Sequence, residues 1–289
     1  REDRAKNHYG FCDQPKVDEF LHALPYELTG AQKKVWQEIL RDISGESVMS
    51  RLVQGDVGSG KTIVALLALM YTGLNGYQSA MMAPTEVLAR QHYENISGML
   101  EAYGIPLKTE LLTGSMTAKA KREAYARIEA GEADIVIGTH ALIQEKVQYQ
   151  NLALVVTDEQ HRFGVKQRKA LKQKGEGVDF LVMSATPIPR TLAMSLYGDM
   201  DVSTIKTLPN GRKKVITKFI KGTSMKPILK DLKDYLLKGG QCYVVCPLVN
   251  ESEAITGRNA SDISKAMAQY FKGQYEVGLV HGQMSDEEK

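Results

Sequence analysis

A glycine-rich string places the strongest constraint on how this chain can fold. Residues 55–62 read Gly-Asp-Val-Gly-Ser-Gly-Lys-Thr and match the pattern G-x-x-x-x-G-K-[ST]. An apolar stretch that favours a strand precedes the string, and a longer apolar stretch that favours a helix follows it. The string therefore predicts a strand, a phosphate-binding loop and a helix in that order. We prefer this interpretation to a glycine-rich turn without a ligand because both flanking elements are present.

The residues of the string have expected roles in binding a nucleoside triphosphate. Backbone N–H groups wrap phosphate oxygens at the N-terminus of the following helix. Lys61 supplies positive charge to the β- and γ-phosphates, and the Thr62 hydroxyl binds Mg²⁺. We therefore expect ATP and Mg²⁺ as ligands, with the loop contacts supplied by Gly55, Asp56, Val57, Gly58, Ser59 and Gly60.

Paired acids follow a second apolar stretch, at residues 154–161, Leu-Val-Val-Thr-Asp-Glu-Gln-His. Asp158 is expected to hold Mg²⁺ and Glu159 to orient and deprotonate the attacking water. Two adjacent acids at a strand end are common on surfaces. Together with a phosphate loop upstream, they predict a site that hydrolyses the nucleotide.

Two shorter patterns carry weaker signals. Ser184-Ala-Thr186 ends another apolar run, and its hydroxyls could sense the γ-phosphate. Thr29-x-x-Gln32 is a capping-box pattern that predicts a helix N-terminus. Gln32 could also hydrogen-bond an adenine edge, and both roles fit only if its amide is shared between them.

Short apolar runs alternate with longer helical stretches along the chain. This alternation predicts an α/β fold with a mostly parallel sheet flanked by helices, in which ligands bind at the carboxyl ends of the strands. Helices are expected at residues 61–72, 86–102, 117–129 and 226–238, with Gly131 and Gly239 as C-caps and Ser224 with Pro227 at the start of the last. Strands are expected at residues 51–54, 79–83, 134–137, 153–157, 180–184, 215–220, 241–246 and 277–280.

Turn-forming and charged residues at 208–214 predict a linker between two domains. A first domain is expected at 25–207 and the beginning of a second at 215–289, with 1–24 as a lead-in from an upstream domain. The chain starts at Arg1 and stops at Lys289, where Ser285-Asp-Glu-Glu resembles the first turn of a helix. We therefore expect a fragment of a longer protein.

Composition excludes several other classes. The longest apolar run, residues 63–71, is too short to span a bilayer, and no signal peptide opens the chain, so we expect a cytoplasmic protein without a membrane partner. Three cysteines are too few for a disulfide framework, and Cys242 and Cys246 are expected as buried thiols on one strand rather than zinc ligands.

The net charge of +3 does not by itself indicate a nucleic-acid partner. Residues 162–174 contain no acid. Residues 212–238 contain many lysines, and their only acids are Asp231 and Asp234. Each basic segment could follow a phosphate backbone or be an ordinary solvated face.

The order of these motifs resembles that of a superfamily 2 helicase. Three longer strings resemble the RecG family of bacterial ATP-dependent DNA helicases: residues 54–62, residues 158–164 (Asp-Glu-Gln-His-Arg-Phe-Gly) and residues 184–191 (Ser-Ala-Thr-Pro-Ile-Pro-Arg-Thr). Residues 197–202 and 243–248 continue the likeness. Transcription-repair coupling translocases are similar, but usually carry Glu where this chain has Gln160.

The resemblance implies two RecA-like domains that close on ATP, and a monomer that acts on branched DNA such as stalled forks and Holliday junctions. It implies that Gln160, His161, Ser184 and Thr186 couple hydrolysis to movement. It also places four residues along the DNA: Thr85, Ser115, Thr139 and His140. These could equally serve only as caps of turns.

The chain departs from the family pattern because it ends before the last motifs, whose arginines reach the γ-phosphate, and lacks the N-terminal wedge. We therefore expect the chain to bind nucleotide and to hydrolyse it poorly. A double-strand translocase that does not unwind DNA and a nucleotide-binding module without catalysis remain as alternatives. The lack of a Leu-Ser-Gly-Gly-Gln string disfavours a transporter ATPase.

Overall fold

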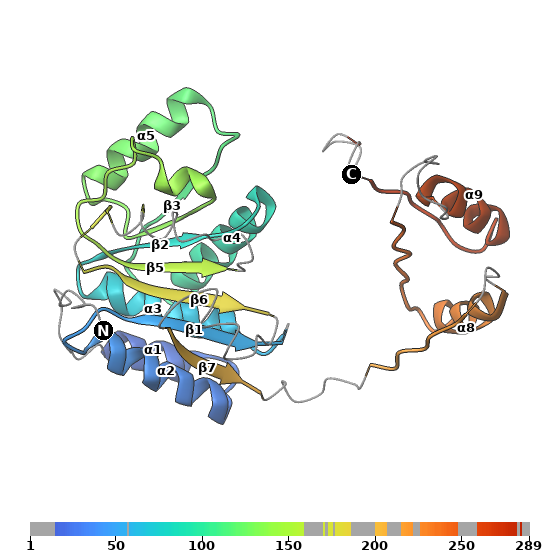
Figure 1. Cartoon of the computed structure of the whole chain (residues 1–289), viewed down its shortest axis with the longest axis horizontal. Helices are drawn as coiled ribbons and strands as arrows, with labels where there is room; N and C mark the ends of the chain where they lie inside the picture. The colour runs from blue at the N-terminus through green and yellow to red at the C-terminus, as the bar shows by residue number, and fades with distance from the viewer. Residues whose placement is uncertain are drawn as a thin grey trace. The chain divides into compact units, whose positions relative to one another are not determined.

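A parallel sheet is the main element of the structure (Figure 1). The computed structural model describes residues 15–56, 58–158, 170, 173–175, 177–185, 200–206, 215–221, 226–247, 259–281 and 284. Within these residues the chain divides into two compact units, Arg1–Lys214 and Val215–Lys289. The expected linker at 208–214 lies outside the described residues, so the proposed domain boundaries stay predictions.

The first unit contains a seven-stranded sheet in the order β3-β4-β2-β5-β6-β1-β7. All paired neighbours are parallel, so the carboxyl ends of the strands lie along one edge. The strands are β1 (Ser50–Gly55), β2 (Gln78–Met82), β3 (Thr109–Leu112), β4 (Ile135–Gly138), β5 (Leu152–Asp158), β6 (Asp179–Ser184) and β7 (Asp201–Ile205). The predicted α/β fold with a parallel sheet is confirmed, as are the five predicted strands between residues 51 and 184.

Helices cover both faces of the sheet. The helical elements of this unit are α1 (Pro15–Ala23), α2 (Gly30–Ile43), α3 (Lys61–Leu74), α4 (Glu86–Ala102), α5 (Ala118–Glu129) and the short 3₁₀ helix η1 (His140–Ile143). In β2, Met81 packs with α3, while Ala80 and Met82 pack with α5 and η1. Neighbouring strand residues are thus buried on opposite faces, which explains their continuous apolar runs.

The apolar run at residues 63–71 is the buried part of α3, the helix that follows the phosphate loop. No helix in the described part of the chain combines the length and apolar character needed to cross a membrane. Gly131 follows the end of α5 and has a φ of 74°, a left-handed conformation suited to the predicted helix end.

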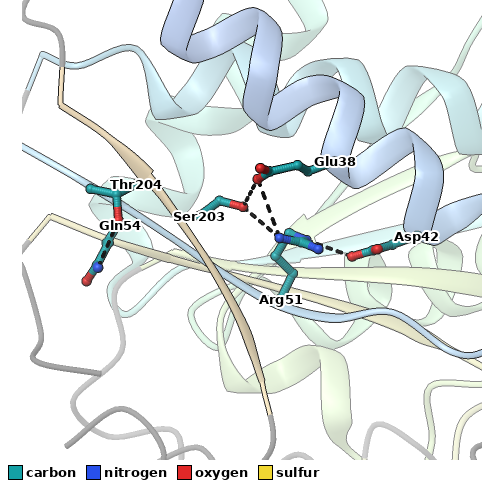
Figure 2. A network of polar contacts seen from close by, with 6 residues as sticks. All are labelled: Glu38, Asp42, Arg51, Gln54, Ser203 and Thr204. Atoms are coloured by element: carbon teal, nitrogen blue, oxygen red, sulfur yellow. Dashed lines mark hydrogen bonds and ion pairs between the residues drawn. The ribbon is translucent and has the colours of Figure 1, made fainter. Parts of the chain in front are cut away.

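A network of polar side chains fastens the edge strand β7 to its neighbours (Figure 2). Arg51 of β1 donates from Nε to Asp42 Oδ2 at 2.6 Å and from Nη1 to the hydroxyl of Ser203 at 2.8 Å. Its Nη1 also lies 3.5 Å from Glu38 Oε2, which accepts a hydrogen bond from Ser203. β1, β7 and α2 are therefore joined by one charged cluster.

A buried glutamine joins three connections at the amino-terminal ends of the strands. Gln78, at the start of β2, donates from Nε2 to the carbonyls of Ile128 and Ala133, each at 2.9 Å. Its Oε1 accepts from the backbone N–H groups of Gln150 and Asn151. One side chain thus makes four hydrogen bonds with backbone groups of α5 and of the loops before β4 and β5.

The second unit contains α8 (Lys226–Leu236) and α9 (Ala260–Tyr270). α8 agrees with the predicted helix and is followed by Gly239 at a φ of 80°, whereas the predicted start at Ser224 lies outside the described residues.

The expected strands at 215–220, 241–246 and 277–280 are not strands in the structure. Their apolar side chains are largely exposed, with Phe219 85% and Val245 92% accessible. These segments have the composition of strands but no hydrogen-bonded neighbour among the described residues, and a strand is defined by its pairing. The expected buried thiols are likewise wrong, because Cys242 is exposed and Cys246 is half-buried.

Candidate nucleotide and DNA site

The sequence motifs lie at the carboxyl edge of the sheet, divided between two neighbouring groups of strands. The phosphate loop follows β1, Asp158 ends β5 and Ser184 ends β6, and these strands are consecutive in the order β5-β6-β1. The four residues that the resemblance assigns to DNA follow β2, β3 and β4, which form the adjacent group β3-β4-β2. We refer to these as the nucleotide group and the DNA group of strands.

The phosphate loop needs glycine at its last position before the helix. Gly60, the N-cap of α3, has a φ of 80° and a ψ of 34°. This left-handed conformation costs other residues about 1–2 kcal/mol. A Cβ atom built on Gly60 would also lie 1.9 Å from the Nε2 atom of Gln32. Gly60 has no side chain, so no side-chain hydrogen bond caps the start of α3, and helix starts of this kind bind anions.

Gln32 supports the loop from α2. The predicted capping box is confirmed, since Thr29 Oγ1 accepts from Gln32 N and Gln32 Oε1 accepts from Thr29 N. Gln32 Nε2 donates to the carbonyls of Ser59 at 3.1 Å and Gly60 at 3.4 Å. The amide is thus shared between the helix cap and the loop, and the adenine contact stays a prediction.

Lys61 and Thr62 form the first turn of α3. The Lys61 ammonium donates to the carbonyl oxygens of Gly55 at 2.5 Å and Asp56 at 3.0 Å, so it lies against the loop. Thr62 and Asp56 are exposed. The Ser59 hydroxyl is buried without a hydrogen-bond partner in the structure. Val57 lies outside the described residues.

Asp158 ends β5, and a histidine of α4 contacts it. His92 Nε2 lies 2.6 Å from Asp158 Oδ2, and the two side chains are 12% and 19% exposed. A carboxylate oxygen only accepts, so the ring nitrogen donates. The assigned roles of Glu159, Gln160 and His161 stay predictions, because these residues lie outside the described ones.

The donor set fits a triphosphate with Mg²⁺. Mg²⁺ prefers oxygen ligands and is usually bound by one or two protein groups together with substrate phosphates. Thr62 offers a hydroxyl and Asp158 a carboxylate, whereas the described residues contain no cluster of three His, Cys, Asp or Glu side chains that would form a protein cage. The uncapped helix start and the lysine beside it suit the phosphates themselves.

The end of β6 adjoins both parts of the nucleotide group. Ser184 is buried and pairs in register with Gln54 of β1, while Met183 pairs with Asp158 of β5. A side chain at this position is therefore close to the loop and to the acidic strand end. Thr186 lies outside the described residues, so its coupling role stays a prediction.

The DNA group presents polar side chains beyond three strand ends. Thr85 and Ser115 are exposed, Thr139 is half-buried and His140 is exposed. Thr85 caps α4 by accepting from Leu88 N at 3.3 Å, and Thr139 is the N-cap of η1. Thr85 therefore caps its helix, whereas Thr139 makes no side-chain capping bond in η1, and the DNA contacts of all four residues stay predictions.

Ser115 is held by Glu86, a residue in the first turn of α4. Its N–H donates to Glu86 Oε1 at 2.8 Å and its hydroxyl donates to Oε2 at 2.5 Å. These hydrogen bonds lower the pKa of the Glu86 carboxyl, and the bond from the Ser115 hydroxyl has the largest effect. Sequence reasoning missed Glu86 and His92, because neither stands in a local pattern that announces its partner.

The basic segments differ in what the structure shows of them. Lys174, from the segment 162–174, donates to the carbonyls of Gln144 and Val147, and desolvation lowers the pKa of its amine. Lys174 therefore stabilises the local fold by binding the backbone at residues 144 and 147. In the other segment, Lys218 pairs with Asp231 at 2.6 Å and both side chains are largely exposed, which is compatible with a solvated face and with a phosphate contact alike.

Comparison with known sequences defines the class of this protein. The sequence model of the DEAD/DEAH box helicase family matches residues 29–195, which include the phosphate loop, Asp158 and Ser184. The chain therefore belongs to the DEAD/DEAH box helicase family, and its sheet is the RecA-like fold that the motifs imply.

Individual relatives agree with the resemblance to RecG. The chain is 50% identical over 276 residues to the ATP-dependent DNA helicase RecG of Streptococcus pneumoniae, covering 96% of this chain and 40% of that protein. It is 47% identical over 270 residues to RecG of Bacillus subtilis, covering 93% and 39%. The chain thus spans about two fifths of the length of these curated relatives.

A solved structure extends the likeness to three dimensions. A structure of RecG bound to a three-way DNA junction has a TM-score of 0.73 and 39% identity, and the match covers 93% of this chain and 34% of that one. The predicted resemblance to RecG is confirmed by these similarities in sequence and fold.

Proposed function

We propose that this chain is the ATP-binding part of a DNA helicase motor that acts on branched DNA, such as stalled forks and Holliday junctions. The observation that carries the proposal is the strand order, which brings a glycine loop, an uncapped helix start and Asp158 to one stretch of a DEAD/DEAH box helicase sheet. The similar RecG structure, which holds a three-way DNA junction, supports the substrate class.

The nucleotide group of strands would bind ATP through the phosphate loop. Backbone N–H groups of residues 55–60 surround the phosphates, and Lys61 exchanges its contacts with the loop carbonyls for the β- and γ-phosphates. Thr62 and Asp158 would hold Mg²⁺, which neutralises phosphate charge when bound. Glu159 acts as the general base on the attacking water, and Gln32 meets the adenine edge.

The DNA group would contact mainly the phosphate backbone, which carries no sequence information directly. We assign the contacts with this DNA backbone to four residues: Thr85, Ser115, Thr139 and His140. We assign the coupling of hydrolysis to movement to four residues: Gln160, His161, Ser184 and Thr186. The protein would act as a monomer and meet both ATP and chromosomal DNA in the bacterial cytoplasm.

Turnover by the full-length protein tests this function. ATP hydrolysis should rise on addition of a three-way junction more than on addition of linear duplex, and the junction strands should separate. Glu159→Gln should keep ATP binding and abolish turnover. A Glu159→Gln protein that hydrolyses ATP at the wild-type rate would show that the general base is another group.

Two other outcomes would assign a different function. Displacement of a bound protein without strand separation would indicate a double-strand translocase. The 289-residue chain itself should bind nucleotide but hydrolyse it slowly, because it corresponds to about two fifths of the length of its RecG relatives. DNA-stimulated turnover by this chain at the full-length rate would contradict that expectation.

A further inference from the structure

The helix α4 begins within the DNA group of strands. Its N-cap, Thr85, follows β2 directly, and Glu86 in its first turn holds Ser115 beyond β3 with both carboxylate oxygens. Lys121 donates to the carbonyl of Gly114 at 2.6 Å and so secures the same turn from α5. The start of α4 is therefore tied to two of the strand ends where DNA is expected.

The same helix reaches the nucleotide group through His92. β2, from which α4 leaves, lies next to β5, which ends in Asp158. The hydrogen bond from His92 Nε2 to Asp158 Oδ2 at 2.6 Å thus crosses the border between the two groups of strands. Both side chains are mostly shielded from water, which strengthens a polar contact.

A hydrogen bond to one carboxylate oxygen fixes the direction in which the other points. Side chains that orient a metal-binding carboxylate in this way affect metal affinity or activity by about 10- to 100-fold when they are removed. His92 is anchored on a rigid element, since Ile96 and Leu100 of α4 are buried against the sheet. A displacement of α4 at its start would therefore be transmitted to Asp158.

We propose that His92 is a positioning residue that couples the DNA group to the nucleotide group by holding the Asp158 carboxylate through α4. The inference rests on the proposed function, in which Asp158 holds Mg²⁺ and the start of α4 meets DNA. DNA bound at Thr85 and Ser115 shifts or steadies α4, and His92 passes this change to Asp158. Coupling through a rigid helix with contacts at both ends is a physical route for such communication.

The first test measures Mg²⁺ rather than activity. A fluorescent ADP is titrated into the 289-residue chain at increasing Mg²⁺, for the wild type, His92→Ala, His92→Gln and the matched control Gln91→Ala, which alters an exposed neighbour on the same helix. His92→Ala should raise the Mg²⁺ concentration needed for half-maximal binding about 10- to 100-fold. Binding without Mg²⁺ should be equal in all four proteins.

The conservative variant separates positioning from folding. His92→Gln places an amide N–H within reach of Asp158, so it should recover most of the Mg²⁺ response and it keeps the test valid if His92→Ala unfolds. A second readout is the ratio of ATP turnover with and without junction DNA in the full-length protein. This ratio should fall about tenfold in His92→Ala and stay unchanged in Gln91→Ala.

The results that would overturn the inference are distinct from those that overturn the function. A Mg²⁺ response and a DNA stimulation equal to those of Gln91→Ala, with only a lower thermal midpoint, would mean that His92 merely pins α4 to the sheet. A shifted Mg²⁺ response with unchanged DNA stimulation would also refute the coupling. Wild-type protein that binds no nucleotide would refute the proposed function itself.

Discussion

Replacing Arg51 with alanine should destabilise the first unit strongly. The Arg51 side chain is 10% exposed and bonds Asp42, Ser203 and Glu38 (Figure 2). Its removal leaves two mostly buried carboxylates without their cation, and breaking a buried ion pair on one side costs about 3–5 kcal/mol. Because the acids keep some contact with water, we expect about 3 kcal/mol. With a denaturant slope near 3 kcal/mol per molar, the urea midpoint falls by about 1 M.

The single tryptophan makes this prediction easy to measure. Trp36 lies in α2, the helix that carries Glu38 and Asp42, and is 8% exposed, so its fluorescence should report unfolding. Lys33→Ala is the matched control, since Lys33 also lies in α2 and pairs with an acid, Glu27, at 3.4 Å, but the two side chains are 55% and 92% exposed. Exposed pairs contribute about 0.2–1 kcal/mol. Equal losses in Arg51→Ala and Lys33→Ala would refute the argument from burial.

Three further substitutions follow from the contacts described above. Gly60→Ala should weaken nucleotide binding, because the added Cβ meets Gln32, whereas Gly104→Ala, which is also at positive φ but has open space around it, should leave binding unchanged in the same titration. Gln78→Leu removes four hydrogen bonds with backbone groups, of which the Ile128 carbonyl keeps a second bond from Gly131 N, and should lower the free energy of unfolding in urea by about 3–5 kcal/mol. Burial raises the pKa of the Asp134 carboxyl, so the stability that this group contributes is lost as pH rises through its folded pKa. Asp134→Asn should therefore gain stability relative to wild type as the pH rises above about 4, the ordinary pKa of an aspartate, and urea titrations at a series of pH values would measure this gain.

The central strands could be predicted because the sequence shows their burial directly. β5 and β6 are covered on both faces, so their runs of apolar residues are continuous. β3 and β7 were not predicted, since they are the two edges of the sheet. Their sequences, Thr-Glu-Leu-Leu and Asp-Val-Ser-Thr-Ile, mix polar and apolar residues because an edge strand is only partly buried.

The second unit shows the limit of composition as a guide. Residues 241–246 have the β-branched and aromatic character of a strand, yet Tyr243 is 88% exposed and the segment pairs with no strand among the residues that the structure describes. Propensity describes a side chain that fits a half-buried pleated surface, and without a neighbouring strand it does not produce one. The phosphate loop, by contrast, was predictable from the sequence, because its conformation depends on adjacent residues and not on a distant strand.

Contacts between distant residues escaped prediction from sequence. His92 and Asp158 are 66 positions apart, and Arg51 and Ser203 are 152 apart. Nothing local to either residue identifies the partner, since each pairing arises only from the strand order. The phosphate loop could therefore be predicted from the sequence, whereas the contacts between residues of different elements could not.

The central claim, that residues 55–62 bind the phosphates of a nucleotide, is tested most directly by titrating a fluorescent ADP into the 289-residue chain. Wild-type protein should bind with an affinity that rises on addition of Mg²⁺. Lys61→Ala should weaken binding about tenfold or more, because it removes the cation next to the β-phosphate, and its urea midpoint should stay within about 0.5 M of wild type. Equal affinity in the two proteins, or no binding by the wild type, would contradict the account.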